Sequence, residues 1–224
     1  MKKVLLGSLV LLFLLSSGCN TPDLNEIIYN YDGKFDYAGQ TYYYVNIGPQ
    51  SWMTDNLNFG RMVFSLTGVD SLRNNGILEK YCYKNDTLNC HYYGALYQWN
   101  EIMNYTHDEL NRGICPPGWR IPSESDFETL IRNVDNDGNA LKAKYQGEGD
   151  GKGNNRSKFA AMLHGIRGAD GAFYYDENIT SFWSSTGPEN NNIAASLRLY
   201  SNSGQVNLMY FDKREGHAVR CIKF

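Results

Sequence analysis

The sequence predicts one α+β domain cross-linked by disulfides, with two short helices early and many short antiparallel strands after them. Three observations lead to this prediction. Two stretches between residues 95 and 134 repeat apolar residues at helical spacing. Short apolar segments separated by turn residues follow them. Four cysteines lie between residues 82 and 221, which suggests covalent cross-links in an exported domain.

The first residues predict a lipoprotein signal peptide over residues 1–18. Two lysines form a basic start, and an apolar run from Val4 to Leu15 follows. This run is shorter than the about 20 residues of a membrane-spanning helix, and small residues then lead to Cys19. We expect cleavage before Cys19 and lipid attachment at its thiol, although Ser16 stands where such signals usually carry leucine. Because stable anchoring takes two acyl chains, diacylglycerol would fix the chain to the cell envelope, and we expect the outer membrane.

Residues 19–38 are expected to form the lipid anchor and a tether, because polar and turn-forming residues dominate them apart from one apolar patch that suits a short early strand. From Gly39 the composition changes, and the domain is predicted to cover residues 39–224. Gln40–Ile47 and Ser51–Leu57 read as two strands, and the residues Gly-Pro-Gln between them are a turn sequence. A hairpin therefore opens the domain.

An exposed insertion and a short helix are predicted next. Residues 59–80 show no clear period and contain several turn residues, so we interpret them as the insertion. Ala95, Trp99, Ile102 and Met103 then recur at helical spacing, which predicts a short helix with one buried apolar face.

The strongest helical pattern in the chain begins after Ser123. Ser123 is a typical N-cap residue, and Asp126 stands three residues later, where an acidic side chain completes a capping box. The apolar residues follow the spacing i, i+3, i+4 and i+7 on one face, at Phe127, Leu130, Ile131 and Val134. After a loop rich in Gly, Asp and Asn over residues 147–155, short strands are predicted at residues 159–163, 172–175, 182–185, 195–200, 206–211 and 218–222.

Charge and composition narrow the class of partner. The net charge is −3 and the basic residues are scattered, so no basic field exists that would attract nucleic acid. The 17 tyrosines and 22 glycines are typical of exported, turn-rich β domains, and aromatic side chains can also stack on sugars. We expect no cofactor and no nucleic-acid partner.

The four cysteines of the domain allow three disulfide connectivities. A polar stretch that can fold back on itself separates Cys82 from Cys90, so we pair these two locally and pair Cys115 with Cys221. The second bridge would close a loop of about one hundred residues, worth roughly 4 kcal/mol in the chain-entropy model. A zinc site at Cys82, Cys90 and His91 is the rival interpretation, but the spacing lacks the C-x2-C pair of structural zinc sites.

Five segments together resemble the Fibrobacter succinogenes major paralogous domain, a family found in exported proteins and lipoproteins of Fibrobacter and Bacteroidota. The resemblance covers residues 39–224 and implies a fold similar to C-type lectin-like domains and to formylglycine-generating enzymes. That fold joins its ends with a long-range disulfide, in agreement with the pairing of Cys115 with Cys221. The family has no assigned activity. The segments are Val45–Leu57, Tyr93–Trp99, Cys115–Ser123, Phe182–Thr186 and Val219–Lys223.

No motif in the sequence supports a catalytic or metal site. Asp135, Asp137 and Asn139 alternate like the start of a calcium loop, but Gly138 is misplaced for an EF-hand and no closing Glu follows. Formylglycine-type oxidation needs a free thiolate, and two disulfides would leave none in the domain. Ser184 or Ser185 with His164 or His217 is a conceivable hydrolase pair, yet no nucleophile-elbow sequence surrounds either serine.

The candidate binding residues are polar and aromatic positions in two late loops, because such side chains can stack on sugars and hydrogen-bond their hydroxyl groups. Solvated loop tips are the alternative interpretation. Asp70-Ser71-Leu72 and Asp86-Thr87-Leu88 also resemble sites of O-glycosylation. The candidates are Tyr174, Tyr175, Asp176, Asn178, Glu189 and Asn190.

We therefore expect a membrane-anchored, non-enzymatic lipoprotein whose domain recognises a glycan or a protein at the cell envelope. A structural or adhesive envelope protein without a small ligand is the alternative, and a polysaccharide-active enzyme is a weaker one. Two convergent carboxylates in a cleft would favour the enzyme.

Overall fold

The computed structural model describes residues 31–68, 72–189 and 191–224. These residues belong to one compact unit, Tyr31–Phe224, which begins before the boundary expected at Gly39. The reason is β1 (Gly33–Tyr37), which lies in the expected tether and pairs with β2 (Gln40–Ile47). The predicted signal peptide and Cys19 lie outside the described residues. Within the described ranges no helix is long and apolar enough to cross a membrane.

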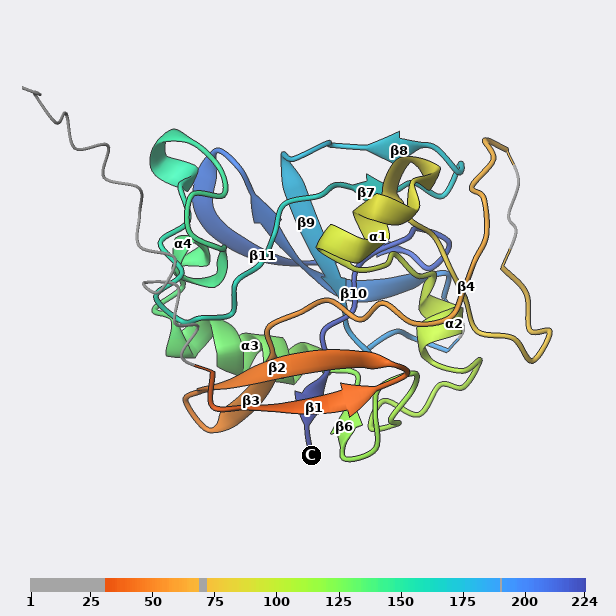
Figure 1. Ribbon diagram of the computed structural model, residues 1–224, viewed down its shortest axis with the longest axis horizontal. Helices are drawn as coiled ribbons and strands as arrows, with labels where there is room; N and C mark the ends of the chain where they lie inside the picture. The colour runs from red at the N-terminus through yellow and green to blue at the C-terminus, as the bar shows by residue number, and fades with distance from the viewer. Residues whose placement is uncertain (1–30, 69–71, 190) are drawn as a thin grey trace, which may run out of the picture. The chain divides into compact units, whose positions relative to one another are not determined.

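A five-stranded sheet joins the two ends of the compact unit (Figure 1). Its order is β1, β2, β3 (Gln50–Met53), β12 (Ile222–Lys223) and β6 (Trp119–Arg120), and its pairs are antiparallel. The predicted hairpin is therefore present, although its second strand ends at Met53 rather than Leu57. The last strand of the chain lies between β3 and β6.

A second, three-stranded antiparallel sheet has β10 (Ile193–Tyr200) at its centre, with β9 (Ile179–Trp183) and β11 (Ser203–Asp212) beside it. Two smaller pairs complete the strands of the described residues. β4 (Arg61–Met62) pairs in parallel with β5 (Glu79–Lys80), and β7 (Ile166–Arg167) pairs with β8 (Phe173–Tyr174).

The helix after Ser123 forms as predicted. α3 (Glu124–Asn133) has a capping box, in which Ser123 Oγ accepts from the Asp126 backbone N–H at 3.3 Å and an Asp126 carboxylate oxygen accepts from the Ser123 N–H at 2.7 Å. Phe127, Leu130 and Val134 are buried, and α3 contacts both β10 and β11. The local pattern therefore determines this helix correctly.

Other helices differ from the expectation. α2 (Trp99–Ile102) is a single turn, because Leu96 is already engaged in an antiparallel bridge with Tyr81. The segment between Cys82 and Cys90 is helical rather than a simple loop. It contains a 3-10 turn, η2 (Tyr83–Asn85), and α1 (Thr87–Tyr93), which the Asp86 carboxylate caps by accepting from the Leu88 N–H at 2.9 Å.

Further short helices follow α3. α4 (Gly138–Leu141) begins at Asp137, and a 3-10 turn, η3 (Gly149–Gly151), interrupts the predicted loop. The stretch 159–163 forms no strand, because Lys158 and Ala160 have positive φ angles, which extended strands do not tolerate. The predicted strand 182–185 is the end of β9, and of the stretch 218–222 only Ile222 lies in a strand.

Two large apolar clusters form the core. One contains Trp99, Trp183 and the disulfide Cys115–Cys221, and the other contains Trp52 and Phe127. Both disulfides pair as predicted, Cys115 with Cys221 and Cys82 with Cys90.

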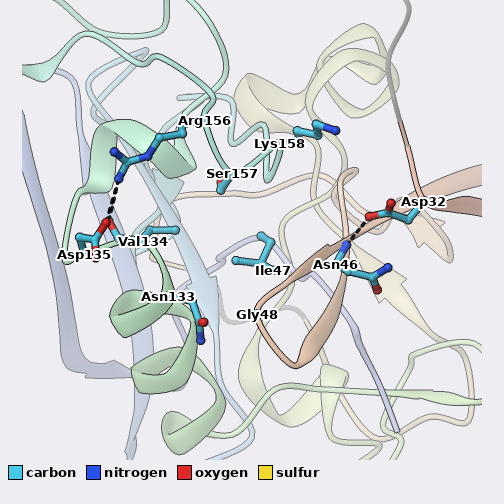
Figure 2. A pocket seen from close by; sticks show the side chains of 10 residues that line it. All are labelled: Asp32, Asn46, Ile47, Gly48, Asn133, Val134, Asp135, Arg156, Ser157 and Lys158. Carbon is cyan, nitrogen blue, oxygen red and sulfur yellow. Dashed lines mark hydrogen bonds and ion pairs between the residues drawn. The ribbon is translucent and has the colours of Figure 1, made fainter.

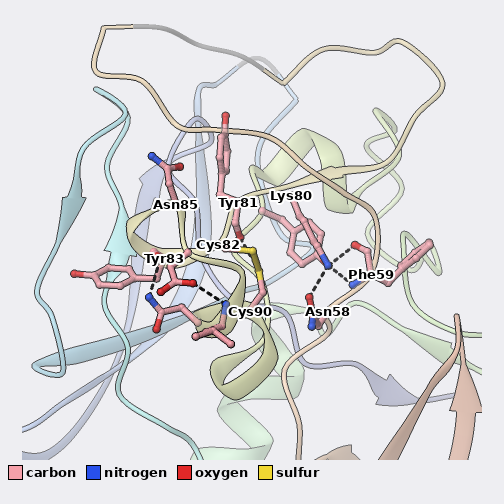
Figure 3. The surroundings of a disulfide bond; sticks show 12 residues. Asn58, Phe59, Lys80, Tyr81, Cys82, Tyr83, Asn85 and Cys90 are labelled. Carbon is pink, nitrogen blue, oxygen red and sulfur yellow. Dashed lines mark hydrogen bonds between the residues drawn. A yellow bond between two sulfur atoms is a disulfide. The ribbon is translucent and has the colours of Figure 1, made fainter.

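Figure 3 shows the Cys82–Cys90 disulfide and its surroundings. Beside it, at the end of the insertion that was predicted over residues 59–80, Lys80 Nζ donates to Asn58 Oδ1 at 2.6 Å. That insertion is not wholly exposed, since Ser65, Leu72 and Glu79 are buried.

Candidate functional site

A polar pocket with a volume of about 400 Å³ opens between four segments of the compact unit (Figure 2). Pockets that hold small ligands in proteins begin at about 300 Å³, so this volume suits a small molecule or one or two sugar rings. The lining residues are Asp32, Asn46, Ile47, Gly48, Asn133, Val134, Asp135, Arg156, Ser157 and Lys158.

One wall of the pocket depends on a glycine in the β2–β3 turn. Gly48 has φ +57°, and a Cβ added there would come within 2.0 Å of Asn133 Oδ1. A side chain at position 48 would therefore displace the exposed Asn133 amide, and the positive φ angle would add backbone strain. The close approach places Asn133 beside the backbone of the turn. Asn133 Nδ2 donates to the Thr129 carbonyl at 2.8 Å, which leaves Oδ1 as the acceptor without a partner among the described residues.

The turn after α3 supplies the second wall. Asp135 and Asn136 have positive φ angles, which reverse the chain at the end of the helix. Arg156 holds this turn, because Nη2 donates to the Val134 carbonyl at 3.3 Å and lies 3.4 Å from Asp135 Oδ2 and 3.8 Å from Asp137 Oδ2. The Asp135 side chain is nevertheless 86% exposed, so its carboxylate remains accessible to a ligand.

The third part of the lining comes from the segment before β1 and from β2. Asp32 Oδ2 accepts from the Asn46 backbone N–H at 2.6 Å, and Asn46 Oδ1 accepts from the Ser51 hydroxyl at 2.6 Å. The Asn46 Nδ2 group has no partner within the described residues and remains available as a donor. Ser157 is not available, since its hydroxyl donates to the Ala140 carbonyl and accepts from the Phe159 N–H.

The pocket therefore presents hydrogen-bond donors and acceptors from amide, carboxylate and cationic side chains. The Ser157 hydroxyl already has two hydrogen-bond partners, so it is not available as a nucleophile. A hydroxyl group of a ligand both donates and accepts a hydrogen bond, so amides, carboxylates and cations side by side suit a polyhydroxylated ligand. Asp135 stands in the calcium-like stretch, but the other lining residues read as ordinary turn or strand residues, so the sequence did not point to this pocket.

Three of the predicted residues at and after β8 already have hydrogen-bond or ion-pair partners. The Tyr174 hydroxyl donates to Asp170 Oδ2 at 2.5 Å, and Asp176 forms an ion pair with Lys84. Asn178 uses both ends of its amide, donating to the Asp176 carbonyl at 2.8 Å and accepting from Ser201 at 3.3 Å.

The Tyr175 side chain stays 55% exposed, so its ring is open to a ligand. Glu189 does not join this group. Ile179, which follows Asn178, pairs with Tyr200, whereas Glu189 lies beyond the other end of β9. At about 3.3 Å per residue the five residues of β9 separate these ends by roughly 17 Å. Asn190 lies outside the described residues. The structure therefore divides the predicted binding residues between two places.

The serine–histidine pair that the sequence argued against is not assembled in the structure either. Ser184 Oγ accepts from the Thr186 N–H at 2.8 Å, and Ser185 Oγ lies 3.4 Å from the Pro122 carbonyl. His164 instead contacts Asn56 and Thr180.

A different serine lies beside a histidine. Ser196 Oγ is 3.0 Å from His217 Nδ1, and His217 Nε2 is 3.0 Å from Glu215 Oε2. This order resembles a nucleophile, base and carboxylate array. However, Ser196 and His217 are fully buried, and the imidazole stacks on Trp183 at 4.0 Å between ring centroids. Burial lowers the pKa of His217 to about 4, so the ring is neutral at pH 7. We read this chain of hydrogen bonds as part of the core.

The calcium-like stretch forms helix-terminal and turn contacts. The Asp137 carboxylate caps α4 by accepting from the Asn139 N–H at 2.9 Å, and Asn139 Nδ2 donates to the Asp150 carbonyl at 2.8 Å. The described residues contain no group of three or more His, Cys, Asp or Glu placed to hold a metal ion. Of the two glycosylation-like tripeptides, Asp70 and Ser71 lie outside the described residues, whereas Thr87 is exposed at the start of α1.

Comparison with family models identifies the family of the domain. The Fibrobacter succinogenes major domain matches residues 45–223, which include most of the five-stranded sheet and the whole three-stranded sheet. No curated protein and no solved structure matches the chain.

Proposed function

The chain belongs to the Fibrobacter succinogenes major domain family, and from this premise we propose that it is a non-enzymatic binding protein of the cell envelope that recognises a glycan. The observation that carries the proposal is the polar pocket between the β2–β3 turn, the end of α3 and residues 156–158. Asn46 Nδ2 and Asn133 Oδ1, which have no partner among the described residues, and the exposed Asp135 carboxylate offer both kinds of hydrogen bond that a sugar hydroxyl needs.

The fold that we propose is C-type lectin-like. Its support is the arrangement of the chain ends, since β2, β3 and β12 lie in one sheet and Cys221 is joined to Cys115 next to β6. An experimental structure superposed on lectin-like domains tests this assignment, and a different strand order in the five-stranded sheet would contradict it.

We place the protein on the outer membrane through a lipid at Cys19. The support is the sequence alone, in which a basic start and an apolar run lead to Gly18 and Cys19. Cells fed labelled palmitate should label the unmodified chain and not the Cys19→Ala variant. Equal labelling of both chains would contradict lipidation, and recovery in the inner-membrane fraction would contradict the location.

The first binding experiment is an array of plant, host and bacterial polysaccharides probed with the purified chain, with calcium and then with chelator. A hit should weaken about tenfold in Asn46→Ala, because roughly 1.4 kcal/mol of hydrogen bonding is lost. Asn74→Ala is the matched control, since Asn74 is an exposed amide in the insertion, outside the pocket lining. Equal loss in both variants would contradict the pocket as the site.

Absence of binding to every polysaccharide on the array would contradict glycan recognition and favour a protein-binding or adhesive envelope role. The measurement with chelator tests whether calcium takes part. Binding that needs calcium would contradict a site made of side chains and backbone alone.

Polysaccharide hydrolysis is a second candidate, because the carboxylates of Asp32 and Asp135 line the same pocket. A general acid must stay protonated near neutral pH, which usually requires an apolar surrounding. Both carboxylates are exposed to solvent, so we favour binding. Release of reducing ends from an array hit, lost in Asp32→Asn, would support hydrolysis instead.

A further inference from the structure

Arg198 is a buried cation on the central strand of the three-stranded sheet. Leu197 and Leu199 point into the core cluster, so Arg198 between them points to the opposite face of β10. Only 9% of the residue is exposed. Its Nε donates to Ser181 Oγ at 2.8 Å, and its guanidinium carbon lies 3.8 Å from the centroid of the Phe211 ring.

One guanidinium nitrogen of Arg198 has no partner. Nη2 is buried and makes no hydrogen bond within the described residues. Two other buried cations show the usual arrangement: Arg220 bonds through Nε, Nη1 and Nη2, and Lys142 Nζ donates to three backbone carbonyls. Leaving a buried donor of a charged group unpaired costs at least about 1–3 kcal/mol. Such a group in a folded protein calls for an explanation, and an unseen acceptor is one.

No carboxylate of the described residues forms an ion pair with Arg198. The acidic group that acts on it is Glu215, whose Oε2 lies 3.0 Å from His217 Nε2 instead. Burial lowers the pKa of the Arg198 guanidinium, and the nearby Glu215, Tyr200 and Tyr175 act in the opposite direction. Tyr175 lies beyond the same end of β10 as Tyr200, because its carbonyl accepts from the Asn178 N–H at 3.0 Å and Ile179, the residue after Asn178, pairs with Tyr200.

We propose that Arg198 anchors a second binding position for an oxyanion carried by a saccharide, at the end of the β10–β11 pair where Tyr200, Asn207 and Met209 are partly exposed. A guanidinium presents a planar fork of N–H donors that matches a carboxylate or a sulfate, and the bonds to an anion are stronger than those to a neutral oxygen. Tyr175 is 55% exposed and supplies an aromatic face for the sugar ring that carries the anion.

Access to Nη2 requires a small movement, since the atom is covered. Met209 lies on the same face of the sheet, because it pairs with Ser196 two residues before Arg198. Met209 is 42% exposed and its side chain is unbranched. Rotating it aside breaks the 3.7 Å bond that its sulfur accepts from the Tyr200 hydroxyl, and because a thioether is a weak acceptor the cost is low. The position is distinct from the polar pocket, whose lining comes from other segments of the chain.

The test compares two probes on the full chain by calorimetry: trigalacturonate and its uncharged methyl ester. Trigalacturonate should bind at least about tenfold more tightly than the ester, the ratio expected for one charge-assisted bond of roughly 1.4 kcal/mol. Equal affinities, or no binding of trigalacturonate or of a sulfated galactan trisaccharide, would overturn the proposal. This comparison needs no variant, so it does not depend on how a substitution folds. The sulfated probe then shows which oxyanion is preferred.

Two arginine variants test whether Arg198 causes the preference for trigalacturonate over its methyl ester. Arg198→Gln should abolish the preference for the acid over the ester, whereas Arg132→Gln, which removes an exposed arginine on α3, should leave it intact. Preserved discrimination in a folded Arg198→Gln chain would overturn the proposal. Asn46→Ala should not affect trigalacturonate binding, so failure of this position and failure of the polar pocket can be told apart.

Discussion

Arg220 and Asn56 are joined by a hydrogen bond of 2.7 Å between Nε and Oδ1, although 164 residues separate them along the chain. The other guanidinium nitrogens of Arg220 donate to the carbonyls of Phe159 and Ala160, and Asn56 Nδ2 donates to the Tyr93 carbonyl at 2.7 Å. The buried Arg220 guanidinium and its partner Asn56 therefore connect four segments that are distant in the sequence. Its charge is satisfied by carbonyl dipoles and by the face of the Phe159 ring at 4.3 Å.

Arg220→Met should destabilise the domain by at least about 3 kcal/mol. The substitution leaves buried acceptors on Asn56, Phe159 and Ala160 without donors, and each such loss costs about 1–3 kcal/mol. Urea unfolding followed by tryptophan fluorescence measures the change. Arg132→Met is the matched control, because its side chain is 65% exposed and surface substitutions stay within about 0.5 kcal/mol. Similar losses in both variants would show that the buried network contributes little.

The two disulfides should differ in what they contribute. Cys115 and Cys221 are 106 residues apart, and Cys82 and Cys90 are 8 apart. In the chain-entropy model the longer loop is worth about 4.7 kcal/mol and the shorter roughly 2.5 kcal/mol. The double variant Cys115→Ala/Cys221→Ala should therefore unfold at lower urea than Cys82→Ala/Cys90→Ala. The reverse order would mean that native packing outweighs loop entropy at these bridges.

Local information explains what could be predicted from the sequence. The helix that begins at Glu124 depends on a cap and an apolar spacing within about a dozen residues, and both are visible in the sequence. The helix at Thr87–Tyr93 was missed because it has little apolar periodicity, and its ends are held by the Asp86 cap and the bridge between Cys82 and Cys90.

Long-range contacts explain what could not be predicted. The stretch that begins at Phe159 reads as a strand, but the Phe159 and Ala160 carbonyls bond to Arg220, and positive φ angles at Lys158 and Ala160 bend the chain.

The polar pocket was missed for a related reason, since Asp32, Asn46, Asn133 and Lys158 are polar residues in separate segments and each looks like a solvated position. Tyr174 is the opposite case. The sequence proposed it as a binding residue but could not reveal that its hydroxyl bonds to Asp170.

Ser123→Ala should destabilise the domain by about 1 kcal/mol, the usual worth of an N-cap hydroxyl. The Ser123 hydroxyl accepts from the Asp126 N–H, and without it that donor at the start of α3 loses its partner. Thermal unfolding followed by circular dichroism gives the shift. The control is Thr87→Ala, which removes an exposed hydroxyl from the first turn of α1 and should change stability by less than about 0.5 kcal/mol. An equal effect of the two substitutions would contradict the capping role.

Stability should fall as the pH is lowered from about 6.5 to about 4, because of two buried histidines. Burial lowers the pKa of His164 and of His217 to about 4, with Arg220 adding to the effect at His164 and Glu215 opposing it at His217. Between pH 4 and 6.5 the unfolded chain binds protons at these rings and the folded chain does not, so unfolding becomes easier as the pH falls. Stability from this source is complete above pH 6.5 and is lost by about pH 4.

Each histidine can account for roughly 3 kcal/mol over this range, since one pKa unit corresponds to about 1.4 kcal/mol. Urea unfolding at a series of pH values measures the slope, which carboxylates also influence. The His164→Gln and His217→Gln variants separate the two sources, because glutamine does not titrate. Each variant should be less stable than the unmodified chain at pH 7 but should lose less stability between pH 6.5 and 4. A slope unchanged by both substitutions would mean that these rings are already protonated in the folded domain, and that His217 donates to both Ser196 and Glu215.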